Sequence, residues 1–391
     1  MAAIKLAEPV SATSFSRIKS IDILRGAIMV LMAIDHVRVY SGIPAGGPTP
    51  GIFFTRWVTH FSAPGFAFLA GTSAFLYSLK LQNNGKLARF LLTRGLLLVF
   101  LELTLIRFFW TFNFNYGAFT LAGVIWMLGW CMVILSLFVR LSPRTIGIIG
   151  LFIIFGQQIF HVIPKIFPAS IAKPVGYAWN FFYPADLPTM PGIAILYVLI
   201  PWIGVMMAGY GFGQILLLGP KKRRKICLRL GISAILAYLI IGSLIIVLGP
   251  AYEGKLNPVF RLLNQQKYPA SQLFLMMTLG PLIALLPFAE RSSGWLSRTL
   301  ETIGRVPMFY YLLHILLIHV SALLTNFIIS GTMHQEWYGS APFVEVDESR
   351  RWNLPLLYLV YFVDLVLLYF ACRWYGIYKF GHPDRKWLKY I

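Results

Sequence analysis

Long apolar runs, interrupted by proline, glycine and clusters of charge, make up most of the 391-residue chain. A bilayer core about 30 Å thick requires roughly 20 apolar residues for each helix that crosses it. The pattern therefore predicts an all-α, polytopic membrane helix bundle with about ten transmembrane helices. The predicted spans are residues 21–40, 57–79, 90–110, 117–139, 145–163, 191–218, 229–249, 270–289, 306–330 and 354–372.

The composition agrees with this pattern and excludes two other classes of protein. Hydrophobic residues make up 58% of the chain and charged residues 12%, whereas a soluble domain has about 25% charged residues. A disordered chain would need low hydrophobicity and high charge. The three cysteines have no CxxC spacing, so we expect neither a disulfide framework nor a zinc site, and no metal.

The charge distribution predicts the topology. The chain has 34 Lys and Arg against 14 Asp and Glu, for a net charge of +20. When both termini are placed in the cytoplasm, most of the basic residues fall in the inner segments, as the positive-inside rule requires. The positive net charge then reflects membrane orientation and contact with anionic lipids, not nucleic-acid binding. We expect a cytoplasmic segment 1–20, a transmembrane domain 21–378 and a basic cytoplasmic tail 379–391, as a multi-pass inner-membrane protein.

The first span carries charges that a simple membrane anchor would avoid. Each ionisable group at the centre of a span costs about 2.5–3.5 kcal/mol. Arg25 and His36 lie about 20° apart around the helix and about 16 Å apart along it, so they share one polar face. Asp35 beside His36 can influence its tautomer and basicity. His36 is therefore a candidate general base or proton relay. The alternative is an interhelical hydrogen bond that only stabilises the bundle.

Two further segments place polar residues near His36. In the second span, Arg56 and His60 share a face at the external level, and residues 70–74 (AGTSA) form a small-residue patch that predicts close helix packing. In the ninth span, His314 is the better candidate for the site, because His319 points about 140° away from it. Tyr311 and Thr59 are candidate donors to an oxyanion.

Three classes of function fit these residues. The chain has no P-loop, dinucleotide fingerprint, HExxH or GxSxG motif. Intramembrane acids and histidines are typical of proton-coupled transporters as well as of an enzyme that works within the bilayer. A non-catalytic membrane scaffold is the third interpretation.

Several motifs together resemble one family. They are the segment from Arg17 to Gly26, the sequence Asp35-His36-Val37-Arg38, and residues 54–57, 63–66, 69–73, 268–271, 277–281 and 304–314. This combination resembles the bacterial membrane family related to heparan-α-glucosaminide N-acetyltransferase. The spacing from Arg25-Gly26 to His36 is also similar to that of membrane acyltransferases that O-acetylate surface glycans.

The resemblance implies transfer of an acetyl group from cytosolic acetyl-CoA to an amine or hydroxyl of an extracytoplasmic glycan or a similar small acceptor. Membrane lipids and a second copy of the chain, as a homodimer, are further expected partners. In this interpretation the residues of the catalytic step are His36, Asp35 and His60. The CoA phosphates would be bound by Arg25, Arg94 and Arg305. The outer site would be lined by Arg38, Arg56, Tyr311 and His314.

The sequence departs from the family pattern at one point. In the lysosomal enzyme the position that matches His36 resembles an Asn, and the catalytic His lies in the following external loop. Residues 41–59 contain no His here. The base would then be His36, as in the glycan O-acetyltransferases, with His60 as a second candidate. The sequence leaves open whether an acetyl-histidine intermediate or a ternary complex reacts.

Overall fold

The computed structural model describes residues 18–46, 49–184, 186–250 and 256–390, which are predominantly helical. The longer helices are α1 (Lys19–Tyr40), α3 (Ser62–Leu81), α4 (Asn84–Leu101), α6 (Val124–Phe138), α7 (Pro143–Phe155), α10 (Trp202–Phe212), α11 (Pro220–Leu248), α13 (Gln272–Arg291), α14 (Trp295–Gly304), α15 (Pro307–Ser330) and α16 (Leu354–Gly381). Nearly all of the predicted segment 1–20 lies outside the described residues.

Short elements connect these helices. They are α2 (Pro50–Trp57), η1 (Val58–Phe61), η2 (Glu102–Ile106), α5 (Arg107–Thr111), β1 (Thr120–Ala122), α8 (Ile159–Val162), η3 (Ile163–Ile166), η4 (Ala169–Ile171), α9 (Ala172–Trp179), β2 (Ile193–Ile195), η5 (Gly213–Leu217), α12 (Pro258–Leu263), η6 (Gln335–Tyr338), η7 (Glu348–Arg350) and η8 (Lys386–Lys389). The strands β1 and β2 pair in parallel, with Leu121 opposite Ala194. The helical class is confirmed, with this small sheet as an addition.

Part of the predicted set of membrane spans is supported by helix length and composition. Among the described residues, α11, α13, α15 and α16 are long and apolar enough to cross a bilayer. A bent pair, α7 followed by α8 and η3 at 57°, would make a fifth span. The helices α1, α3 and α4 coincide with three further predicted spans. The count of ten and the side on which the termini lie stay predictions.

Two predicted spans are wrong at their N-terminal ends. Residues 117–123 were expected in a helix, but α6 begins only after Gly123, and the backbone of Thr120–Ala122 pairs with β2 instead. Residues 191–201 were also expected to be helical, but α10 begins at Trp202, directly after Pro201. Proline lacks the N–H that a helix interior needs. Both segments are apolar enough to resemble part of a membrane span. They pair with each other although they are far apart in the sequence, and a local pattern does not reveal such a contact.

Helix α14 occupies a segment that was expected to be a cytoplasmic loop, and it packs tightly on α1. A Cβ atom on Gly26 would lie 1.9 Å from the Leu300 carbonyl oxygen, so the two backbones are in direct contact. At the same end of α1, Lys19 Nζ lies 3.7 Å from Glu301 Oε2. The Arg305 guanidinium lies 5.9 Å from the centre of the Phe380 ring. The beginning of α1 and the end of α16 therefore lie at one end of the bundle.

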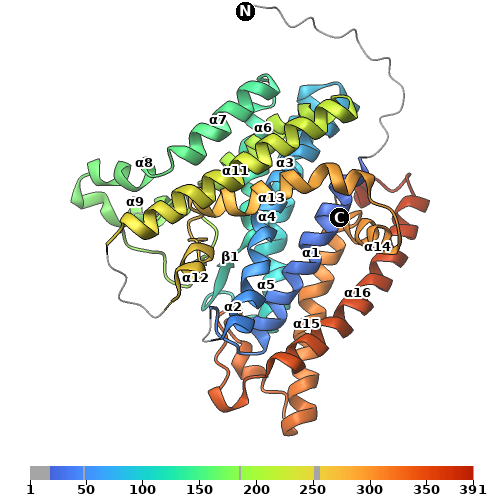
Figure 1. Ribbon diagram of the computed structural model, residues 1–391. Helices are drawn as coiled ribbons and strands as arrows, with labels where there is room; N and C mark the ends of the chain where they lie inside the picture. Colours follow the sequence, from blue (N-terminus) through green and yellow to red (C-terminus); the bar gives the residue numbers. More distant parts are fainter. Residues whose placement is uncertain (1–17, 47–48, 185, 251–255, 391) are drawn as a thin grey trace, which may run out of the picture.

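Helix α1 is the central helix of this arrangement. It packs against α3, α13, α14, α15 and α16, and most of its residues are buried. Figure 1 shows α7 and α11 crossing obliquely to the direction of α1, α15 and α16. Because several helices surround α1, its polar side chains meet protein groups instead of lipid tails. This position explains how a helix with so many charges is accommodated in an apolar bundle.

The small-residue patch at 70–74 packs as the sequence predicts. A Cβ atom on Gly71 in α3 would lie 1.9 Å from the Met206 carbonyl oxygen in α10, and one on Gly209 would lie 2.1 Å from the Phe68 carbonyl oxygen. The two backbones therefore touch through glycines on both helices. Small residues at such crossings let helices approach closely enough for dense van der Waals packing.

This crossing yields a stability prediction. The Gly71→Ala substitution should destabilise the protein by about 1–3 kcal/mol, because an added methyl group must push two backbones apart. The matched control is Gly376→Ala in α16, where an added Cβ meets no atom within 4 Å. That control should be neutral or stabilising, because Ala favours helix over Gly. Reversible unfolding in detergent micelles measures both changes, and equal stabilities for the two variants would contradict the packing argument.

Candidate active site

A cavity of about 80 Å³ lies beside the second half of α1. Segments that are distant in sequence form its wall: α1, η1 with the start of α3, η2, the residues around β1, the segment after β2, the loop before α13, and α15. Its polar lining residues are Asp35, His36, Thr59, Ser62, Glu102, Tyr197, Lys267, Tyr268 and Tyr311. The predicted residues Asp35, His36 and Tyr311 thus meet at one cavity, together with polar groups from other parts of the chain.

A short contact beside the cavity joins two histidines from different helices. His36 Nδ1 lies 2.7 Å from Nε2 of His314 in α15. The other nitrogen of His314, Nδ1, lies 2.6 Å from the Tyr311 carbonyl oxygen and 3.1 Å from that of Tyr310. Because a carbonyl oxygen only accepts hydrogen bonds, His314 Nδ1 carries the proton.

The proton on His314 Nδ1 determines which of the other ring nitrogens of His314 and His36 are protonated. In neutral His314, a protonated Nδ1 leaves Nε2 as an acceptor, so His36 Nδ1 must donate to it. Neutral His36 then has a bare Nε2, which makes no hydrogen bond to any residue that the structure describes. His36 lines the cavity, so a ring with one unprotonated nitrogen belongs to the cavity wall.

His314 itself lies behind His36 and does not line the cavity. It is fully buried, and the Tyr310 and Tyr311 rings pack against it, with ring centres 5.3 and 5.0 Å away. The structure therefore brings His314 to the site as predicted, but as the residue that holds His36. His319, on another face of α15, bonds to the Phe109 carbonyl oxygen and to Gln335.

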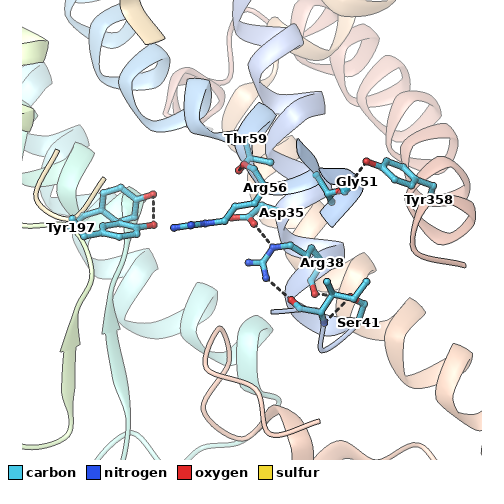
Figure 2. A network of polar contacts seen from close by, with 11 residues as sticks. Asp35, Arg38, Ser41, Gly51, Arg56, Thr59, Tyr197 and Tyr358 are labelled. Carbon is cyan, nitrogen blue, oxygen red and sulfur yellow. Dashed lines mark hydrogen bonds and ion pairs between the residues drawn. The ribbon is translucent and has the colours of Figure 1, made fainter. Parts of the chain in front are cut away.

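Asp35 and Arg38 form an ion pair on α1 at the cavity wall. Arg38 Nε donates to Asp35 Oδ1 over 2.8 Å, and a second Arg38 nitrogen donates to the Ile43 carbonyl oxygen over 2.7 Å (Figure 2). Arg38 is buried and does not line the cavity. Its hydrogen bonds hold Asp35 in place, whereas the sequence suggested that Arg38 contacts the substrate and that Asp35 orients His36.

The residues predicted on the second span divide into two groups. Thr59 lines the cavity, but its hydroxyl donates to the Arg56 carbonyl oxygen over 2.7 Å, which uses its only proton. His60 is 2% exposed and packs against Phe274 with ring centres 5.4 Å apart. Neither His60 nor Arg56 lines the cavity. Tyr311 differs from Thr59, because no described residue accepts its hydroxyl proton.

One lysine, which the sequence assigned only to an external loop, lies in the cavity wall. Lys267 is the only Lys or Arg among the lining residues. Its Nζ lies 5.8 and 5.2 Å from the centres of the Tyr197 and Tyr268 rings, a cation–π arrangement. The two tyrosine hydroxyls are 3.4 Å apart. Within the described part of the chain, no carboxylate lies within ion-pair distance of Lys267, and its positive charge acts on Asp35 in the same cavity wall.

A carboxyl group lies elsewhere in the cavity wall. Glu102 begins the π-helical segment η2, is 2% exposed, and lies beside Gly123, which directly precedes α6. A Cβ atom on Gly123 would lie 2.1 Å from Glu102 Oε1, so this position requires glycine. Short π-helical segments are frequent at functional sites.

The three arginines that were assigned to the CoA phosphates do not line this cavity. Arg25 donates to Ser73 Oγ over 2.7 Å and to the Gly304 carbonyl oxygen over 3.3 Å, so it lies between α3 and α14. Arg94 lies in the middle of α4, 5.9 Å from the centre of the Phe90 ring. Arg305 follows α14. These groups belong to the end of the bundle where α1 begins.

Helical periodicity singled out His36 and His314, Asp35 was predicted as the neighbour of His36, and Tyr311 was predicted as a hydroxyl donor; Lys267 and Glu102 were not among the predicted site residues. A signal for Lys267 existed, because it directly precedes the motif at 268–271 that carries the family resemblance. For Glu102 the signal was its place inside an apolar span. No group of three or more metal-binding side chains occurs among the described residues.

Comparison with known families agrees with the motifs. The family model described as heparan-alpha-glucosaminide N-acetyltransferase, catalytic, matches residues 17–248. No curated protein matches the chain. The matched region includes α1, η1, α3 and Glu102, while Lys267, Tyr311 and His314 come after it. Because the match covers more than half of the sequence, the chain belongs to the heparan-α-glucosaminide N-acetyltransferase family of membrane acetyltransferases.

Proposed function

We propose that this protein transfers an acetyl group from cytosolic acetyl-CoA to an amine or hydroxyl of a glycan or similar small acceptor on the far side of the inner membrane. The observation that carries the proposal is the His36–His314 hydrogen bond, which leaves a bare imidazole nitrogen at a polar cavity. A general base must lie within hydrogen-bond reach of the proton that it removes, and it must be unprotonated. His36 Nε2 meets both conditions for an acceptor in this cavity.

The reaction can be written with every proton accounted for. The acceptor nitrogen or oxygen attacks the thioester carbonyl carbon, and its proton moves to His36 Nε2. The new C–N or C–O bond forms as the C–S bond breaks, and the departing sulfur takes the proton from His36. The His314 nitrogen that accepts from His36 Nδ1 stabilises the transient imidazolium, and Asp35 adds a nearby negative charge.

Lys267 is suited to stabilise the oxyanion that forms during the attack. A positive charge that is fixed before the reaction and shielded from bulk water stabilises developing negative charge at little reorganisation cost. The Lys267 ammonium group lies against two aromatic rings and shares the cavity wall with Asp35. The free hydroxyl of Tyr311 is a second donor for the same oxygen.

The donor would approach from the other end of α1. Arg25, Arg94 and Arg305 lie at that end, where basic side chains can bind the CoA phosphates. Arg25 and His36 are about 16 Å apart along the helix, so the long arm of CoA would have to follow this face. Met29 and Met32 lie between them, and their unbranched side chains can move aside more easily than branched ones. A proton-coupled transporter, the competing interpretation, receives no support from the family match.

The first prediction about the proposed function tests the base. The His36→Ala variant should lose acetyl transfer by about 100- to 10,000-fold, because general-base catalysis contributes that much. The assay uses purified protein in proteoliposomes with labelled acetyl-CoA inside and methyl α-glucosaminide outside, with products identified by mass spectrometry. Retention of transfer by a folded, inserted variant would contradict the role of His36. Solute flux without acetylated product in the wild type would favour transport.

The second prediction tests how His36 is held. The His314→Leu variant removes the acceptor for His36 Nδ1 and should lower kcat by about 10- to 100-fold, as is typical when the partner that orients a histidine is lost. The matched control is His319→Leu, since His319 is also fully buried on α15 but does not contact His36. Both variants lose buried hydrogen bonds, so only a catalytic role separates their kcat values. Equal kcat losses in the two variants would argue against the assigned tautomer.

The third prediction concerns the oxyanion. The Lys267→Met variant should lower kcat by about 100- to 1,000-fold, the usual effect of removing one oxyanion donor, with little change in the KM for acetyl-CoA. Lys173→Met is the matched control, because Lys173 also lies over an aromatic ring, 5.9 Å from the centre of Tyr177, but does not line the cavity. An unchanged kcat for Lys267→Met would exclude Lys267 from the transition state.

A further inference from the structure

Two neighbouring helices, α11 and α13, share a surface that lies outside the candidate active site. They pack against each other, and both are long and apolar enough to cross a bilayer. A Cβ atom on Gly231 in α11 would lie 2.7 Å from the Ala284 side chain in α13. Because the helices approach so closely at this point, side chains on either side of it form one surface.

One part of this surface, which we call the α11–α13 patch, consists of Arg224 from α11 and of Leu285, Phe288 and Arg291 from α13. The Arg224 guanidinium lies 6.0 Å from the centre of the Phe288 ring. Leu285 and Arg291 are each three residues from Phe288, so both lie next to it on the surface of α13. All four side chains are exposed, Leu285 by 53% and Phe288 by 52%. The patch therefore combines two positive charges with accessible apolar groups.

The protein itself does not neutralise these two charges. Neither Arg224 nor Arg291 forms an ion pair or a side-chain hydrogen bond with any residue that the structure describes. Glu290, which directly precedes Arg291, is occupied, because both of its carboxyl oxygens accept from Arg223. This ion pair connects α11 to α13 and also removes the negative charge that would repel an anion. The patch is therefore suited to a ligand with negative charge.

The chemistry of the patch favours one kind of ligand. Arginine binds phosphate oxygens through paired, charge-assisted hydrogen bonds. Basic side chains between membrane helices bind the head groups of anionic lipids, and an acyl chain gains free energy when it covers exposed apolar side chains such as Leu285 and Phe288. A free phosphate ion would use the arginines alone. A phospholipid uses both the charged and the apolar part.

We propose that the α11–α13 patch binds one anionic phospholipid, with its phosphate at Arg224 and Arg291 and an acyl chain along Phe288 and Leu285. The site differs from a general attraction between lipid and the basic residues of α11. Lys222 and Arg229 are also exposed, but they lie about 160° and 140° around the helix from Arg224. They therefore belong to another face of α11.

Native mass spectrometry of the full chain in detergent, titrated with dioleoyl-phosphatidylglycerol, tests this site. The wild type should bind one molecule of this lipid more tightly than dioleoyl-phosphatidylcholine, which has the same acyl chains and no net charge. The Arg224→Gln/Arg291→Gln variant should bind phosphatidylglycerol about 10- to 30-fold more weakly, because each basic group near an anionic head group contributes several-fold. Its affinity for phosphatidylcholine should not change.

The matched control is the Lys222→Gln/Arg229→Gln variant. It removes the same number of exposed charges from the same helix, but from the other face. Its affinity for phosphatidylglycerol should stay close to that of the wild type. Equal losses of affinity in the two double variants would show a diffuse attraction to the basic residues of α11 and would overturn the site. Displacement of the lipid by millimolar inorganic phosphate would instead indicate an anion site without acyl-chain recognition.

A measurement on the wild type applies if the first double variant does not fold. Phosphatidylglycerol with a photoreactive acyl chain should label the segment from Leu285 to Phe288 more strongly than the matching phosphatidylcholine does, as peptide mapping by mass spectrometry can show. Equal labelling by the two lipids, or no labelling of this segment, would contradict the proposal. Neither readout uses acetyl transfer, so a failure of this inference and a failure of the proposed function are distinguishable.

Discussion

The hydrogen bond between His36 and His314 is the contact on which the account of this protein depends. It joins the central helix α1 to α15, and its direction is set by backbone carbonyl groups of α15. Those carbonyl groups cannot change their role, so the proton positions on both rings follow from the fold. A helix backbone thus determines which nitrogen of His36 is free for chemistry. The tautomer of His36 therefore follows from the packing of two helices.

The surrounding structure places two kinds of polar group at two ends of α1. At its beginning, Arg25 connects to α3 and α14, and other basic groups lie nearby. Near its end, the cavity combines a free imidazole nitrogen, an ammonium group and two carboxyl groups. A reaction that joins a polyanionic donor on one side to a polar acceptor on the other requires this separation. The charges that make α1 a poor membrane anchor are the ones that such a reaction would use.

Sequence patterns predicted part of this arrangement for a physical reason. Helical periodicity reveals which residues share a face, so His36 and His314 could be singled out, with Asp35 as the neighbour of His36. Periodicity does not reveal which helices become neighbours, so it could not show that His314 contacts His36 from another helix. Lys267 was hidden because a loop lysine also fits the charge rule for topology. Glu102 was hidden because periodicity does not show that this position lies beside Gly123, in a later segment of the chain.

The most direct test of the central claim is the protonation of the His36 ring. Solid-state NMR of protein labelled with ¹⁵N-histidine in lipid bilayers distinguishes a protonated ring nitrogen from a bare one, and a His36→Asn sample assigns the signals. The account predicts a protonated Nδ1 and a bare Nε2 for His36, and the same pattern for His314. A proton on Nε2 of His36 in the resting protein would contradict it, because the nitrogen facing the cavity could then accept no proton from a substrate.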